Sequence, residues 1–84
     1  MHELQFSRDF FASTAKLSIE EGGRVMNFIQ KLQENLAHPS ISLERITESR
    51  SEDLWSGRIS RELRAILHRQ GDQVTLLHAG HHDD

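Results

Sequence analysis

The C-terminal third of this 84-residue chain contains three closely spaced runs with β-strand character. Residues 54–60, 63–69 and 73–79 are separated only by residues 61–62 and by the turn sequence at 70–72. Connections this short join antiparallel neighbours, because a parallel pair of strands needs a crossover of a dozen or more residues. This third of the chain is therefore predicted to form an antiparallel β-meander.

The first part of the chain changes from strand to helix periodicity. Residues 3–6 alternate polar and apolar side chains, which predicts a short half-buried strand. Ser7 can cap a short amphipathic helix over residues 8–17. Ser18 and Glu21 then form a capping-box pattern, so a second helix is expected to begin there and to form a hairpin with the first.

The second helix is expected to end before a mostly polar connection. Pro39 is expected to end this helix near Ala37 or His38. The connection that follows is mostly polar, with an abbreviated strand expected over residues 42–46.

The second helix carries a stripe of apolar residues with the 4-3-4 spacing of one helical face. The stripe is widened by Met26 and Phe28, which favours a core position over a dedicated partner groove. Its members are Val25, Ile29, Leu32 and Leu36.

The order of these segments predicts the fold class. We expect an α+β fold in which an N-terminal strand and a helical hairpin precede an antiparallel meander of three to four strands, with the helices on one face. At 84 residues the chain is predicted to form a single domain.

Composition excludes several classes of protein. The chain has no cysteine, which removes disulfides and thiolate chemistry, and it has no apolar run long enough to span a membrane. The N-terminus lacks a secretion signal, so a cytoplasmic location without membrane contact is expected. The net charge of −3 gives no long-range attraction to nucleic acid, so any basic site has to be local.

Basic side chains gather in the predicted meander. Residues 54–84 contain four arginines and four of the six histidines. Arg58, Arg61 and Arg64 either bind an anion or form a solvated face with surface ion pairs, each worth about 0–1 kcal/mol. Trp55 is predicted to lie in the core rather than to stack on a base.

The histidine-rich end suggests a metal site at first sight. His78, His81, His82 and Asp83 have the side chains of zinc ligands. His78 and His81 point to opposite sides of a continuous strand, however, so convergence would require a bend at Gly80. No metal site and no cofactor are predicted.

The meander also carries a resemblance to a known family. It reads Leu-Trp-Ser-Gly-Arg-Ile from residue 54, Leu-Arg-Ala-Ile-Leu from residue 63 and His-Ala-Gly-His from residue 78. These segments and the element order resemble the RelE/ParE toxin superfamily. The resemblance is greater still to RelE-like domains associated with UvrD-type DNA helicases, in which the sequence Gly-His-His-Asp-Asp precedes an aromatic helix. This chain stops at Asp84, so it either continues in the natural protein or lacks that helix.

The resemblance implies a site for cutting messenger RNA. It places Arg64 at the family's arginine on the second meander strand and Arg58 near a basic position on the strand before it. His82 falls where some members have a catalytic arginine, and His81 lies beside it as a second possible acid or base. Glu44 falls near the position of a carboxylate base. Ser56 stands where the most active ribonucleases have a lysine, and the family's final tyrosine has no counterpart.

Two functions of different classes follow from the resemblance. The first is the toxin of a toxin-antitoxin pair, acting either as a metal-independent messenger-RNA endoribonuclease on the ribosome or as an inhibitor of a nucleic-acid enzyme, with an antitoxin protein as partner. The second is a noncatalytic interaction domain of a UvrD-type helicase or repair protein, with a helicase domain as partner.

Overall fold

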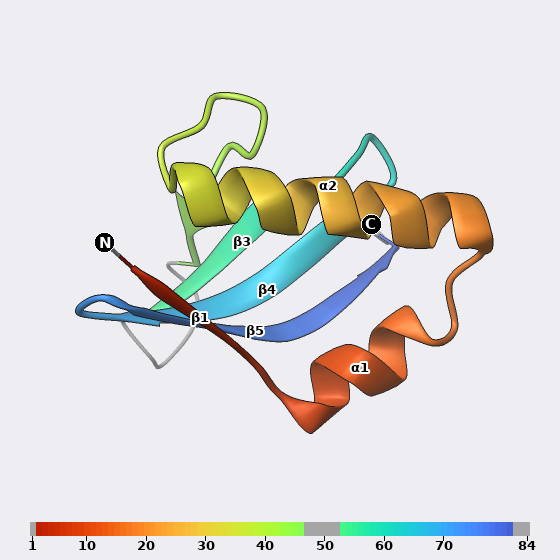
Figure 1. The fold of residues 1–84 in the computed structure, drawn as a ribbon, viewed down its shortest axis with the longest axis horizontal. Helices are drawn as coiled ribbons and strands as arrows, with labels where there is room; N and C mark the ends of the chain where they lie inside the picture. The colour runs from red at the N-terminus through yellow and green to blue at the C-terminus, as the bar shows by residue number, and fades with distance from the viewer. Residues whose placement is uncertain (1, 47–52, 82–84) are drawn as a thin grey trace.

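The fold contains two helices and a five-stranded sheet (Figure 1). A computed structural model describes residues 2–46 and 53–81. In chain order the elements are β1 (Glu3–Phe6), α1 (Arg8–Thr14), α2 (Ile19–Glu34), β2 (Glu44–Arg45), β3 (Leu54–Arg58), β4 (Leu63–Gln70) and β5 (Gln73–His81). The predicted α+β class and element order are confirmed.

Both helices begin where the sequence predicts. The Ser7 hydroxyl accepts a hydrogen bond from the Phe10 N–H, and Ser18 and Glu21 form the complete capping box. Both helices end earlier than expected. α1 stops at Thr14 rather than Leu17, and α2 stops at Glu34, because the extended backbone of Asn35 ends the helix four residues before Pro39.

The sheet has the order β1-β5-β4-β3-β2. Strands β2 to β5 form the predicted antiparallel meander, in which β2 is only two residues long. β1 pairs with β5 in parallel, so the complete sheet is mixed. The turn between β4 and β5 uses Gly71, whose φ of 61° lies in the left-handed region that glycine adopts at little cost.

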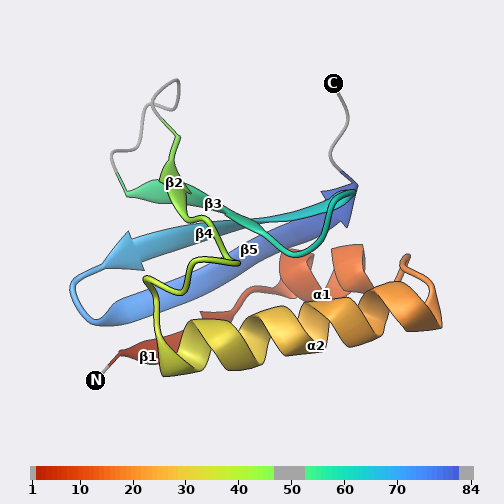
Figure 2. The same cartoon turned by 90° about the horizontal axis from the view of Figure 1, so that it is seen from above.

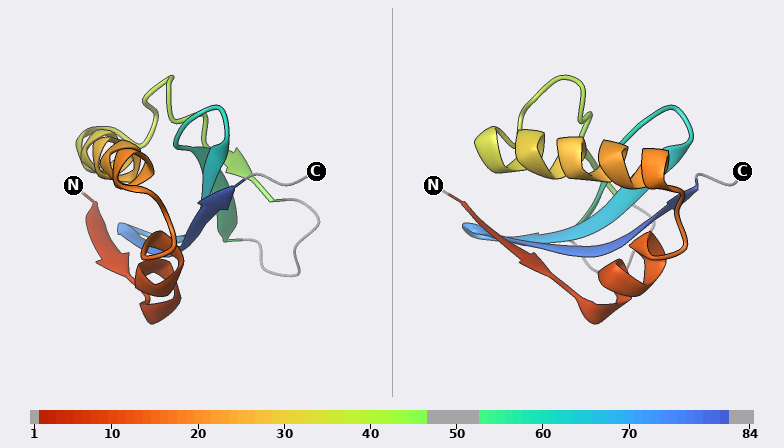
Figure 3. Two further views of the ribbon diagram at one scale, coloured as in Figure 1. Left: turned by 90° about the vertical axis from the view of Figure 1, so that its right-hand side faces the viewer. Right: turned by 45° about the vertical axis from the view of Figure 1, so that its right-hand side comes forward.

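Both helices lie on the same side of β3, β4 and β5 (Figure 2). We call this side of the three strands the helix face and the opposite side the outer face. Within the described residues no helix covers the outer face. The left view of Figure 3 shows α2 nearly end-on, and the right view shows it running lengthwise over the strands.

The core lies between α2 and the helix face. Val25, Phe28 and Leu32 of α2 are buried, and Ile29 and Leu36 of the predicted stripe are half-buried against them. The expected contribution of Met26 is wrong, because its side chain is 60% exposed. The sheet contributes the alternating residues Ala65, Leu67, Val74, Leu76 and Ala79.

Helix α1 packs against the edge of β5 beyond the end of β1. The Ala79 N–H donates to the buried Ser13 hydroxyl at 3.0 Å, and that hydroxyl donates to the Phe10 carbonyl at 2.8 Å. A buried N–H without an acceptor is costly, so Ser13 completes the edge that β1 leaves unpaired.

A register shift between β4 and β5 decides which side chains face outward. Ile66 pairs with His78, whereas the next residue, Leu67, pairs with Leu76, so Leu77 is an extra residue in β5. Because side chains alternate between the faces of a strand, one extra residue moves every following side chain to the opposite face. His78 and Gly80 therefore lie on the outer face, and Ala79 and His81 lie on the helix face.

Candidate functional site

Two arginines meet on the outer face. Arg58, the last residue of β3, pairs directly with Arg64 of β4. Residues directly opposite in an antiparallel pair have Cα atoms about 4.5–5.5 Å apart and side chains on the same face. The neighbouring pair, Gly57 and Ala65, is buried toward the helices, which places both arginines on the opposite face.

This pair is electrostatically unfavourable without a ligand. Like charges directly opposite each other in a sheet destabilise it. Neither arginine forms an ion pair with a carboxylate among the described residues. Since a guanidinium keeps its charge and presents a planar fork of donors, two adjacent ones are suited to a phosphate group.

Glu44 lies on the same face as the arginines. It pairs with Ser56, which lies two residues before Arg58 on β3 and therefore on the same face. A diagonal neighbour across two strands is about 7–8 Å away, within reach of long side chains. The structure thus places the predicted carboxylate Glu44 diagonally next to Arg58, on the same face as Arg64 but two strands from it.

The outer face presents His68 and His78, and His78 is the one that lies beside the arginines. It pairs with Ile66, two residues from Arg64 on β4. Its neighbour Gly80 pairs with Arg64 itself, and a Cβ atom on Gly80 would lie 3.0 Å from Nε2 of His78. The imidazole therefore lies over Gly80 beside Arg64, in space that a larger residue would fill.

Together these side chains form two rows across the sheet. One row contains Arg58, Arg64 and Gly80, and the adjacent row has Glu44 at one end and His78 at the other. Three strand spacings separate the ends, or about 14 Å. We call Glu44, Arg58, Arg64 and His78 the outer-face site.

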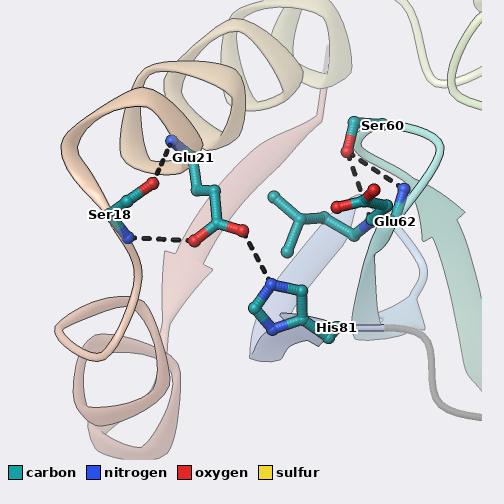
Figure 4. Close-up of polar contacts among 6 residues, drawn as sticks. Ser18, Glu21, Ser60, Glu62 and His81 are labelled. Carbon is teal, nitrogen blue, oxygen red and sulfur yellow. Dashed lines mark hydrogen bonds and ion pairs between the residues drawn. The ribbon is translucent and has the colours of Figure 1, made fainter.

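His81 lies on the other side of the sheet. It pairs with the buried Leu63, and its Nε2 donates to Oε2 of Glu21 at 2.7 Å (Figure 4). The Ser18 N–H donates to the other oxygen of the Glu21 carboxylate at 2.9 Å. The backbone hydrogen bond from Ser18, followed by the contact with His81, lowers the pKa of Glu21 below its ordinary value of 4.5. His81 therefore connects the end of β5 to the start of α2 and does not join the outer-face site.

The remaining predicted site residue, His82, lies outside the described residues, as does Asp83 of the metal hypothesis. Within the described ranges 2–46 and 53–81, no group of three or more suitable side chains could hold a metal ion.

Trp55 is half-buried and packs against the core, as its side of β3 predicts. The Arg69 guanidinium carbon lies 4.6 Å from the centre of its ring, a cation–π contact. This contact is on the helix face, away from the outer-face site.

The sequence interpretation missed His78 as part of this site. It considered His78 only as a metal ligand and chose His81 and His82 as acid or base candidates. A usable signal was the small residue Gly80 two positions later, because residues i and i+2 share a face of a strand.

A different hollow lies between β1, α1 and α2. It has a volume of about 480 Å³ and a mostly apolar lining that includes Phe6, Phe10, Met26 and Ile29. Phe11, which also lines it, is 60% exposed.

No helix in the described part of the chain is both long and apolar enough to cross a membrane.

Comparisons with solved structures identify the fold. A chain of the RelB–RelE antitoxin–toxin complex from Methanococcus jannaschii matches with a TM-score of 0.76 and 14% identity, over 92% of this chain and 88% of that one. A YoeB/ParE toxin from Agrobacterium tumefaciens matches with a TM-score of 0.75 and 13% identity, over 99% of this chain and 100% of that one. The YoeB dimer from Staphylococcus aureus matches with a TM-score of 0.74 and 15% identity, over 98% of both chains.

This chain therefore has the RelE/ParE-like fold. No protein-family model matches its sequence, and no curated protein does. The structural matches are toxins and give no support to the expected association with a helicase.

Proposed function

We propose that this protein is the toxin of a toxin-antitoxin pair and that it cuts messenger RNA at the outer-face site. The observation that carries the proposal is the register pairing of Arg58 with Arg64 on a sheet face where the described residues provide neither a covering helix nor a carboxylate partner. The fold shared with RelE and YoeB toxins supports it.

The proposed reaction is an in-line transesterification. Glu44 accepts the proton of the ribose 2′-hydroxyl, whose oxygen forms a bond to phosphorus while the bond from phosphorus to the 5′-oxygen breaks. The products are a 2′,3′-cyclic phosphate and a 5′-hydroxyl end. Arg58 and Arg64 stabilise the charge that develops on the phosphoryl oxygens.

His78 is the proposed acid for the leaving 5′-oxygen. Attacking and leaving oxygens lie on opposite sides of phosphorus, so base and acid have to approach from opposite sides as well. The positions of Glu44 and His78 at opposite ends of one row support this assignment. An imidazole supplies a proton near neutral pH. His82 is the alternative acid, as the sequence predicts.

An antitoxin is the proposed protein partner. The RelE structure is that of a RelB–RelE complex, which supports the same kind of partner here. The exposed apolar lining of the hollow between α1 and α2 is a surface that a soluble monomer would leave in contact with water. A second copy of the chain is the other occupant to consider.

The test is growth arrest on expression of the protein in bacteria. The wild type should arrest growth, and Arg58→Ala and Arg64→Ala should each relieve the arrest. Arg61→Ala is the matched control, because Arg61 is an exposed arginine in the β3–β4 connection and should arrest growth like the wild type. Absence of arrest by the wild type, or unchanged arrest by both site variants at equal soluble yield, refutes the proposal.

A further inference from the structure

A cationic cleft lies between α2 and the end of β3. It has a volume of about 280 Å³, and residues 40–41 and 58–60 line it opposite the helix. Its cationic side chains are Arg24 and Lys31 of α2, and Arg58, whose side chain lies on the outer face, borders it at the end of β3. The outer-face site and this cleft therefore share one residue, Arg58, at the point where β3 ends.

The two cations on α2 belong to one helical stripe. Asn27, Phe28 and Lys31 lie three, four and seven residues after Arg24, which places all four on one side of the helix. Arg24 and Lys31 are separated by seven residues, or about 10.5 Å along the axis. The burial of Phe28 against Gly57 sets which side of α2 faces the sheet. The two residues are so close that a Cβ added to Gly57 would lie 2.8 Å from the Phe28 ring.

The charge of the cleft is not compensated. No carboxylate among the residues that the structure describes lines it, and its other polar residues are Asn27, Ser40 and Ser60. Glu20 and Glu34 lie one turn from Arg24 and Lys31 on the helix, yet neither forms an ion pair with them. Among the described residues, two cations of α2 thus lie next to Arg58 without an acid in the cleft, in a protein whose net charge is −3.

We propose that this cleft binds the phosphate backbone of single-stranded RNA next to the phosphodiester that is cut. Lysine and arginine neutralise phosphates, and the amide and hydroxyl groups of the cleft can donate to the same oxygens. Arg58 links the cleft to the outer-face site, so one strand can follow the cations from α2 around the end of β3. The choice of RNA as ligand rests on the proposed function.

The experiment measures binding of a single-stranded 2′-O-methyl RNA oligonucleotide over a series of salt concentrations. Methylation removes the nucleophile, so binding is observed without cleavage. The test variant is the double substitution Arg24→Gln and Lys31→Gln. The control is Arg8→Gln with Lys16→Gln, which removes two exposed cations from the region of α1 and so matches the change in net charge.

The test variant should bind at least about tenfold more weakly than the wild type at low salt. Its plot of log affinity against log salt should be shallower by about 1.4, since each phosphate contact to a single strand contributes about 0.7. The control should change both quantities much less.

Three results overturn the proposal: no RNA binding by the wild type, equal losses in both double variants, or displacement of RNA by polyglutamate at comparable concentration. The last result would assign the cleft to an acidic protein segment. Failure of the cleavage proposal is distinguishable. A wild type that binds RNA through Arg24 and Lys31 but does not arrest growth refutes cleavage and leaves the cleft as inferred.

Discussion

The contact between Gly57 and Phe28 sets how closely α2 approaches the sheet. In the substitution Gly57→Ala, the new Cβ would lie 2.8 and 2.9 Å from two carbons of the Phe28 ring and 3.2 Å from Cδ2 of Leu43. Ordinary carbon–carbon contacts are about 3.5–4.0 Å. The ring is only 2% exposed and is surrounded by the core, so it cannot move into solvent to relieve the overlap.

The magnitude follows from two opposing effects. Overpacking a core costs about 1–3 kcal/mol, whereas replacing glycine by alanine within a strand recovers about 0.5–1 kcal/mol of backbone entropy. Because two of the contacts are shorter than 3.0 Å, the cost belongs to the upper part of that range, about 2–3 kcal/mol. We therefore expect a net loss of about 1–2.5 kcal/mol in the free energy of unfolding, or about 5–20 °C in Tm for a domain of this size.

The assay is urea unfolding followed by circular dichroism, with Gly23→Ala as the matched control. A Cβ on Gly23 meets nothing within 4 Å, and the helical position should gain about 0.5–1 kcal/mol. The two glycine-to-alanine substitutions should therefore shift stability in opposite directions. A Gly57→Ala variant as stable as the wild type would refute the close approach of α2 to β3.

Two further predictions concern the contacts that hold α1 and α2 in place. Ser13→Ala leaves the buried Ala79 N–H without its acceptor and should cost about 1–3 kcal/mol in unfolding free energy; Thr14→Ala, one residue along at a more exposed position, should cost less. For Glu21→Gln, the pKa of Glu21 is lowered on folding, so the stabilisation by its charge is fully present above pH 4.5 and is lost as the pH falls through the folded value. The difference in Tm between wild type and this variant should accordingly be largest above pH 4.5 and shrink in acid, whereas a pH-independent difference would contradict the assigned cause.

The meander could be predicted from sequence because its signals are local. The β3–β4 and β4–β5 connections are short enough to require antiparallel pairing, and the strands observed differ from those expected by at most two residues at either end. The face assignment of Trp55 and Gly57 followed from simple alternation, which the structure confirms.

The parallel pairing of β1 with β5 could not be predicted in the same way. It joins Leu4 to Val74, residues seventy positions apart, and no local pattern specifies such a partner. The early end of α2 had a weak local signal. Asn35 is a poor helix residue, but Pro39 is the stronger stop signal, so the prediction placed the end too late.

The composition of the candidate site depended on the register shift in β5. Strict alternation from Leu76 would put His78 on the helix face, whereas the extra residue Leu77 moves it outward beside Arg64. Bulges of this kind are set by packing on both faces and have no reliable sequence signature. Arg58, Arg64 and Glu44 were recognised through the family resemblance, and the structure brings them to one face; their catalytic roles stay predictions.

Cleavage of RNA by the purified protein tests the central claim most directly, with the chemical ends of the products as the readout. The assay uses a messenger RNA, alone and on ribosomes, and compares the wild type with Arg64→Ala and Arg61→Ala. We predict products with 2′,3′-cyclic phosphate and 5′-hydroxyl ends, a loss of about 10²–10³ in rate for Arg64→Ala, and little change for Arg61→Ala. Equal rates for wild type and Arg64→Ala, or no cleavage by the wild type under either condition, would contradict the outer-face site as the place where RNA is cut.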